Sequence, residues 1–189
     1  MDLPREVVAG PPEILEAERA PVDAMDRLIT WLPVNIPPGE ETSIVHGDFR
    51  LDNLMFHPTE PRIVAVLDWE LSTLGHPLAD FAYHCMNWQI PAGMFRGLGG
   101  LDLARLGIPA QDEYVALYCE HTGRDAIDPN HWDFYVAYNL FRGAAILQGI
   151  MGRVKDGTAA GRQAADAGRA ARGMAELAWQ QVEQILSRK

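Results

Sequence analysis

The first regular apolar pattern in the chain predicts a helix. Four apolar side chains recur at helical spacing, namely Met25, Leu28, Ile29 and Leu32. Pro21 suits the first turn of this helix, and the prolines that begin at Pro33 end it. Residues 1–20 carry several prolines and little periodicity. We therefore expect an N-terminal arm or a truncated connector there.

The pattern then changes from helical spacing to short β-prone runs. Residues 43–46 and 54–56 form two such runs, and residues 63–67 (IVAVL) are apolar throughout. An uninterrupted apolar run of this length predicts a buried strand. The sequence HPTEP at 57–61 is typical of a turn. The runs on either side of it are therefore expected to pair as a β-hairpin.

The remainder of the chain is expected to be mostly helical. A helix is predicted over 78–88, and a second over 111–121 with Gly123 as its stop. Asn130 is the expected N-cap of a long helix that continues to residue 153. A last, Ala-rich helix is predicted over 158–188, whereas the glycines of 93–107 indicate a loop.

Composition and charge narrow the possible functions. The 189 residues include 48% hydrophobic and 22% charged residues, as in an ordinary folded domain. The formal net charge of -10 argues against nucleic acid and anionic membranes as partners. No stretch is apolar enough to cross a membrane, and no secretory signal is visible. Because the two cysteines form no CxxC motif, we expect no disulfide framework and a cytoplasmic location.

The candidate chemistry lies in the segment HGDFRLDN at 46–53. Asp48 and Asn53 stand five residues apart on a loop between two β-prone runs, and Asp68 ends the apolar run at 63–67. Two carboxylates and an amide from neighbouring loops suit Mg²⁺, which prefers hard oxygen ligands, and leave one carboxylate to face a hydroxyl group. Phosphoryl transfer requires this combination of metal charge and a positioned nucleophile.

These motifs resemble those of the protein-kinase-like fold, in which His-x-Asp is followed by Asn five residues after the Asp. They are most similar to the aminoglycoside phosphotransferase/choline kinase branch, which has His-Gly-Asp, a strand ending in Asp-Trp, and a G-x-P-x-x-D element like GHPLAD at 75–80. HGDFRLDNLMF and LDWELSTLGHPLAD look closest to the phosphotransferase modules related to those fused to acyl-CoA dehydrogenases.

The resemblance implies a role for each polar residue of the two loops. Asp48 would orient or deprotonate the acceptor hydroxyl, and Asn53 and Asp68 would bind the metal and, through it, the nucleotide phosphates. Arg50 is implied as a catalytic cation, with phosphate contact and a salt bridge to a nearby acid both open. Glu70 is implied either at the metal or as a hydrogen-bonded structural acid.

Two further residues are implied as structural support: His46 would pack beneath the loop, and Asp80 would brace it by hydrogen bonds. The implied fold class is α+β, a mostly helical kinase-like C-terminal lobe over 21–189. A small β-hairpin would carry the catalytic loop at 46–53 and the metal-binding strand end at 67–70.

Arg142 fits a solvated helix face, although contact with an anionic acceptor stays open. Several aromatic residues fit core or groove positions: Trp88, Trp132, Tyr135, Tyr138 and Phe141.

The implied activity is that of a small-molecule kinase, with ATP as co-substrate and Mg²⁺ or Mn²⁺ as cofactor. The acceptor is a small molecule with a hydroxyl group. The branch contains aminoglycoside, choline, homoserine and sugar kinases, and the closest-looking subgroup suggests hydroxyacyl thioesters. The alternative is a truncated, catalytically incompetent pseudo-kinase lobe that acts as a binding or assembly module.

The family also has a β-rich small lobe that grips ATP through a Gly-rich loop and a lysine. Only 45 residues precede His46 here, and they contain no lysine. We therefore expect a large lobe without its nucleotide-gripping partner. Its rim should be partly uncovered, at Ile44, Val45, Phe49, Leu54 and Met55. The expected cover for this rim is the arm at residues 1–12, a second copy in a homodimer (with or without exchange of the N-terminal segment), or the missing small lobe.

Overall fold

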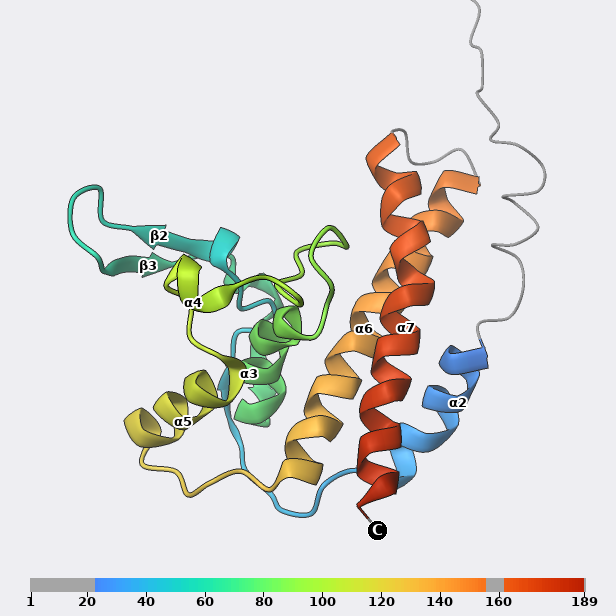
Figure 1. Cartoon of the computed structure of the whole chain (residues 1–189), viewed down its shortest axis with the longest axis horizontal. Helices are drawn as coiled ribbons and strands as arrows, with labels where there is room; N and C mark the ends of the chain where they lie inside the picture. Colours follow the sequence, from blue (N-terminus) through green and yellow to red (C-terminus); the bar gives the residue numbers. More distant parts are fainter. Residues whose placement is uncertain (1–22, 156–161, 189) are drawn as a thin grey trace, which may run out of the picture.

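The computed structural model describes residues 23–155 and 162–188, which form a helical body with two small sheets beside it (Figure 1). The helices are α2 (Asp23–Trp31), α3 (Pro77–Cys85), α4 (Leu103–Leu106), α5 (Gln111–Thr122), α6 (Pro129–Lys155) and α7 (Arg162–Ser187). The strands are β1 (Ser43–Val45), β2 (Leu54–Phe56), β3 (Ile63–Val66) and β4 (Thr73–Gly75). Short 3-10 turns are η1 (Leu32–Val34), η2 (Leu51–Asn53), η3 (Trp69–Leu71) and η4 (Met86–Trp88).

The core of the molecule lies where α6 and α7 pack along each other, with α2 against α7 and α3 against α6. Its fully buried large apolar side chains include Leu28, Leu140, Val136, Met174 and Val182. Burial of each such side chain stabilises the fold by roughly 1.5–3 kcal/mol. Gly143 leaves room for the Met174 side chain between α6 and α7, because a Cβ atom there would lie 2.5 Å from the terminal carbon of Met174.

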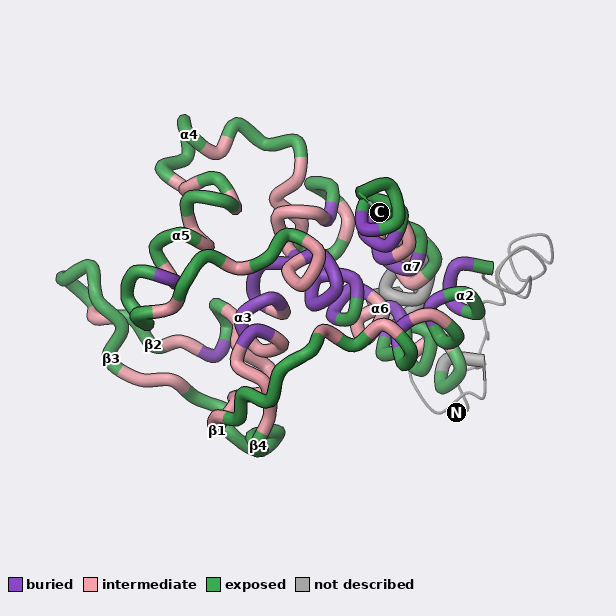
Figure 2. The backbone as a smooth tube through the Cα atoms, turned by 90° about the horizontal axis from the view of Figure 1, so that it is seen from below, coloured by how far each residue is buried: buried purple, intermediate pink, exposed green. Residues whose placement is uncertain are grey.

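The four strands form two antiparallel pairs. β1 pairs with β4, with Ile44 opposite Leu74, and β2 pairs with β3, with Leu54 opposite Val66. The second pair is the hairpin predicted from the turn at 57–61. Its predicted burial is wrong, because Ile63 and Val64 are more than 40% exposed. The hairpin projects from the helical body, so its apolar side chains lie on an exposed ribbon (Figures 1 and 2).

The helical predictions are confirmed in position, with differences at the ends. The helix predicted over 78–88 is α3 followed by η4, and α5 ends at Thr122, just before Gly123, whose φ of 64° is the left-handed conformation of a helix stop. Asn130 is not the N-cap of α6. The helix begins at Pro129, and Oδ1 of Asp128 accepts hydrogen bonds from the backbone N–H groups of Asn130 and His131 at 2.7 and 3.3 Å.

Other expectations meet the structure in part or fall on residues that it does not describe. The loop expected over 93–107 contains the short helix α4. The arm at 1–20 and the first residues of the helix predicted from 158 lie outside the described residues. None of the helices within the described ranges is both long and apolar enough to cross a membrane. The fold class is α+β, as predicted.

Candidate active site

The loop between β1 and β2 holds three of the predicted site residues in one hydrogen-bonded group. Oδ2 of Asp48 accepts hydrogen bonds from Nε of Arg50 at 2.9 Å and from Nδ2 of Asn53 at 3.1 Å. Nδ2 of Asn53 also donates to the backbone carbonyl of Asp48 at 2.9 Å. Asn53 is buried, whereas the Asp48 side chain keeps 16% of its surface exposed. The loop therefore presents a fixed carboxylate to solvent.

The end of β3 lies beside this loop. The Leu67 N–H donates to the carbonyl of Asn53 at 2.8 Å, which brings the next residue, Asp68, close to the amide. Asp68 has φ 66° and ψ 52°, a left-handed conformation that is strained for a residue with a side chain. Its carboxylate and that of Glu70 are exposed, and neither has a hydrogen bond or ion pair within the described residues.

The available metal ligands are therefore one amide oxygen and exposed carboxylates. Nδ2 of Asn53 donates to Asp48, so Oδ1 of the same amide is the atom that can face a cation. Asp68 follows the residue that pairs with Asn53 and has no other partner in the described ranges. Within those ranges, no three histidine, cysteine, aspartate or glutamate side chains converge as a self-sufficient metal cluster.

His46 and Asp80 hold the loop from below. The Asp80 carboxylate accepts hydrogen bonds from the backbone N–H groups of His46 and Gly47 at 2.7 and 2.9 Å. Nδ1 of His46 accepts from the Asp48 N–H at 3.2 Å, so Nε2 carries the proton and donates to the Leu67 carbonyl at 2.8 Å. Because both ring nitrogens are occupied, His46 cannot take a proton from a substrate.

Gly47 is required by the close packing of this loop. Its φ is 82°, and a Cβ atom there would lie 2.5 Å from the carbonyl oxygen of Leu71. A side chain at this position would therefore be strained and would also displace η3 from the loop.

Tyr83 also contacts the loop, which the sequence patterns did not predict. The Tyr83 hydroxyl donates to Oδ1 of Asp48 at 2.7 Å. Burial, reinforced by the hydrogen bond to Asp48, raises the pKa of Tyr83 to about 12. Tyr83 follows Asp80 by three residues on α3, and this helical spacing is the signal that could have identified it.

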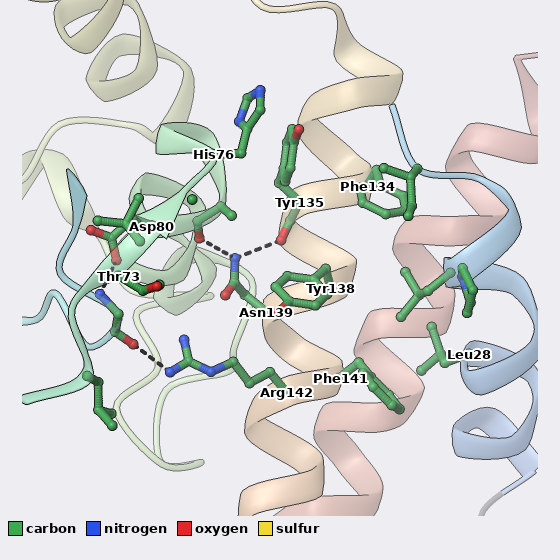
Figure 3. Close-up of a pocket in the computed structure, with 18 of the residues that line it drawn as sticks. Leu28, Thr73, His76, Asp80, Phe134, Tyr135, Tyr138, Asn139, Phe141 and Arg142 are labelled. Atoms are coloured by element: carbon green, nitrogen blue, oxygen red, sulfur yellow. Dashed lines mark hydrogen bonds between the residues drawn. The ribbon is translucent and has the colours of Figure 1, made fainter. Parts of the chain in front are cut away.

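Arg142 does not lie on a solvated helix face, as the sequence favours, because its side chain points inward from α6. Its Nη2 donates to the carbonyl of Gly47 at 2.5 Å, as Figure 3 shows. Its guanidinium also covers the ring of Tyr83, 4.9 Å from the ring centroid. The contact joins residues 95 positions apart, so no local pattern could have revealed it.

Arg50 forms salt bridges in this structure, one of the two alternatives left open. Besides its contact with Asp48, its Nη1 lies 3.6 Å from Oδ2 of Asp52. Asp52 also pairs with Arg96, which belongs to the loop after η4. These side chains are 31–55% exposed, so the ion pairs with Asp52 are weak enough to exchange for a stronger anion.

A cleft of about 760 Å³ opens next to the loop (Figure 3). α2 and η1 contribute one apolar wall, and α6 contributes the other. The cleft reaches the loop at Gly47, Asp80 and Arg142. Of the aromatic residues noted in the sequence, Tyr135, Tyr138 and Phe141 line it, whereas Trp88 and Trp132 do not.

The chain is similar in sequence to a known protein family and to several known proteins. Residues 8–147 match the phosphotransferase enzyme family. Acyl-CoA dehydrogenase family member 10 of Mus musculus is 46% identical over 179 residues, which cover 94% of this chain and 17% of that protein. Acyl-CoA dehydrogenase family member 11 of Homo sapiens is 40% identical over 150 residues, which cover 79% of this chain and 19% of that protein.

A solved structure is also similar to the chain. It comes from Ralstonia eutropha JMP134 and is provisionally named an aminoglycoside phosphotransferase. The two share 56% sequence identity and a TM-score of 0.82, and the match covers 92% of this chain and 53% of that one. The chain thus spans about half of the solved structure and 17–19% of the two relatives above.

Proposed function

The chain belongs to the phosphotransferase enzyme family, and we propose on this basis that it transfers the γ-phosphoryl group of ATP to a hydroxyl group of a small molecule. The observation that carries the proposal is the contact between Asp48 and Asn53, whose side chains meet at 3.1 Å. It fixes a partly exposed carboxylate and, because the amide nitrogen of Asn53 is engaged, leaves the amide oxygen free for a cation. Phosphoryl transfer needs both a group that positions the nucleophile and a set of oxygen ligands for a metal.

In the proposed reaction, Asp48 positions the acceptor and takes its proton. The acceptor oxygen forms a bond to the γ-phosphorus, the bond from this phosphorus to the β,γ-bridging oxygen breaks, and ADP leaves with that electron pair. The hydroxyl proton passes to the Asp48 carboxylate. Arg50 lies beside Asp48 and would exchange its exposed ion pairs for the transferred phosphoryl group, whose negative charge a guanidinium stabilises.

The oxygen ligands of Asn53 and Asp68 suit Mg²⁺, and Mn²⁺ is the alternative. When bound, the ion would neutralise charge on the ATP phosphates. The protein supplies few ligands, so phosphate oxygens would complete the coordination, as is usual for Mg²⁺. Glu70 is close in sequence to Asp68 and exposed, and it remains a proposed contributor to this shell.

The cleft beside Gly47 is the proposed site for the non-reacting part of the acceptor. Its apolar walls, with the Arg142 guanidinium at one end, favour an acceptor that has an apolar part over a polycation. Asp80 is the acid that lines it, and its carboxylate already accepts two backbone hydrogen bonds. We therefore favour a hydroxyacyl thioester over an aminoglycoside as the acceptor class.

A nucleotide titration tests the proposal. Thermal unfolding of the chain at millimolar ATP, with and without Mg²⁺, should show stabilisation that depends on the metal. Asp68→Ala should remove the dependence on Mg²⁺, whereas Asp112→Ala, an exposed acid on α5, should retain it. Transfer of labelled phosphate from ATP to a hydroxyacyl thioester and to an aminoglycoside then identifies the acceptor. An identical response of both variants to Mg²⁺ would reject Asp68 as a metal ligand, and a wild type that ATP and Mg²⁺ do not stabilise would leave the non-catalytic binding module as the better account.

A further inference from the structure

The phenol of Tyr83 donates a hydrogen bond to the Asp48 carboxylate, and the reaction proposed above gives this contact no role. The two carboxylate oxygens have different partners. Oδ2 accepts from Arg50 and Asn53, whereas Oδ1, within the part of the chain that the structure describes, accepts only from the Tyr83 hydroxyl, at 2.7 Å. A carboxylate oxygen can accept about two hydrogen bonds, so Oδ1 keeps one position for a further donor. An acceptor hydroxyl is such a donor.

Two helices fix the position of this phenol. On α3, Asp80 holds the backbone of the loop while Tyr83, one turn later, holds its carboxylate. From α6, Arg142 covers the Tyr83 ring and binds the Gly47 carbonyl. Nδ2 of Asn139 ties the two helices together by donating to the Ala79 carbonyl at 2.8 Å (Figure 3). The Tyr83 hydroxyl therefore cannot move independently of the loop that it contacts.

The protonation state of the phenol suits a permanent donor. Burial and the contact with Asp48 raise the pKa of Tyr83 to about 12. At neutral pH the hydroxyl keeps its proton, so it donates to the carboxylate throughout and cannot itself accept the proton of a substrate. Its contribution is orientation of the carboxylate and dispersal of its charge.

We propose that Tyr83 is a positioning residue for phosphoryl transfer, which orients Asp48 so that the free position on Oδ1 faces the acceptor hydroxyl, while Arg142 holds the phenol in place. This inference rests on the proposed function. The acceptor proton still passes to Asp48, and Tyr83 keeps its own. Such a residue acts on the rate of transfer and not on nucleotide affinity, because its contact lies on the acceptor side of the reaction.

Hydrolysis of Mg·ATP, with water as the acceptor, measures this role without a known substrate. Tyr83→Phe should lower kcat about tenfold or more and leave the KM for ATP within about twofold, since it removes a hydrogen bond to a charged group. Tyr114→Phe is the matched control, because this half-buried tyrosine on α5 lies outside the cleft and its hydroxyl has no hydrogen bond within the described residues. Equal kcat values for the two variants, or a change in KM alone, would overturn the proposal.

A second measurement separates this inference from the proposed function. The carboxyl carbon of Asp48, observed by NMR at pH 7, should shift in Tyr83→Phe and stay unchanged in Tyr114→Phe, with both variants shown to be folded by thermal unfolding. If wild-type hydrolysis does not exceed that of Asp48→Asn, the proposed function fails while the NMR result still decides whether Tyr83 orients Asp48. An unchanged Asp48 signal in Tyr83→Phe would reject the positioning role in either case.

Discussion

At the scale of single residues, the polar groups near the loop fall into two sets. His46, Asp48, Asn53 and Asp80 are joined by hydrogen bonds that fix their orientation. Asp68, in contrast, combines a left-handed backbone with an exposed carboxylate that has no partner within the described residues. Strained backbone conformations that no contact within the protein stabilises are typical of ligand-binding and active sites.

The role of Asp48 leads to the first prediction. Asp48→Asn preserves the size of the side chain but removes the group that accepts the hydroxyl proton. We expect kcat for phosphoryl transfer to fall by about 100-fold or more, with little change in the KM for ATP. Steady-state kinetics on Asp48→Asn and on Asp52→Asn, the other acid of the same loop, measure the difference. A change confined to KM would assign Asp48 to nucleotide binding.

The backbone of Asp68 leads to the second prediction. Asp68→Gly and Asp68→Ala both remove the carboxylate, but only glycine relieves the left-handed strain. Asp68→Gly should therefore be more stable than Asp68→Ala by about 1 kcal/mol, and both should lose the response to Mg²⁺. Chemical denaturation of the two variants gives the free energies of unfolding. Equal stabilities would mean that the φ of 66° is not a source of strain.

At the scale of elements, sequence patterns predicted the turns and loops whose structure depends on residues close together in the chain. The HPTEP turn identified the β2–β3 hairpin, and the loop at 46–53 identified Asp48, Arg50 and Asn53 as a group. Burial of β3 was predicted wrongly, because an apolar run cannot reveal whether another element covers it. The cap predicted at Asn130 is wrong because the helix begins one residue earlier, at Pro129, and the side chain of Asp128 accepts the first backbone N–H groups.

The contacts that complete the site could not be predicted in the same way. Tyr83 meets Asp48 across 35 residues, and Arg142 meets Gly47 across 95. Such contacts depend on how α3 and α6 pack, which hydrophobic periodicity does not specify. Only the spacing of Asp80 and Tyr83 on one helix carried a usable signal.

Helix α3 also contains a buried histidine that should make stability depend on pH. His84 packs among Phe49, Trp88 and Tyr114, and its Nδ1 has no hydrogen-bond partner within the described residues. Burial lowers the pKa of His84 in the folded state. The unfolded state therefore binds the proton more readily, so the contribution of His84 to stability is present above about pH 6.5 and is lost as the pH falls below it.

The third prediction follows from the direction in which the His84 pKa shifts on folding. His84→Phe keeps an aromatic side chain in the cluster and removes the titrating group. Between pH 7 and pH 5, the free energy of unfolding should fall less in His84→Phe than in the wild type. His121→Gln, which changes an exposed histidine on α5, should follow the wild type. Parallel pH profiles for His84→Phe and the wild type, measured by denaturant unfolding, would show that His84 is not protonated in this range.

At the scale of the whole molecule, burial is uneven. Buried residues concentrate in α2, α3, α6 and α7, whereas the strands are largely exposed (Figure 2). The exposed apolar side chains of the strand region are Ile44, Leu51, Met55, Phe56, Ile63, Val64, Leu67, Trp69, Leu71 and Leu74. Of the rim predicted from the sequence, Ile44 and Met55 are exposed, and Val45, Phe49 and Leu54 are partly covered.

The last prediction concerns what covers this apolar surface. Ile44 and Leu74 are 74% and 70% exposed and stand directly opposite each other on β1 and β4. Surfaces of this kind are uncommon on monomers, so we expect residues 1–189 to self-associate, most simply as a symmetric dimer. The net charge of -10 opposes association, and added salt should therefore strengthen the self-association by screening this charge.

Light scattering across protein and salt concentrations should show a mass that falls to that of a monomer when Ile44 and Leu74 are both changed to Ser. The double change Ile146→Ser and Leu186→Ser, at exposed positions on α6 and α7, should leave the mass unchanged. A wild type that stays monomeric at high salt would instead favour a separate nucleotide-binding lobe as the partner of this face.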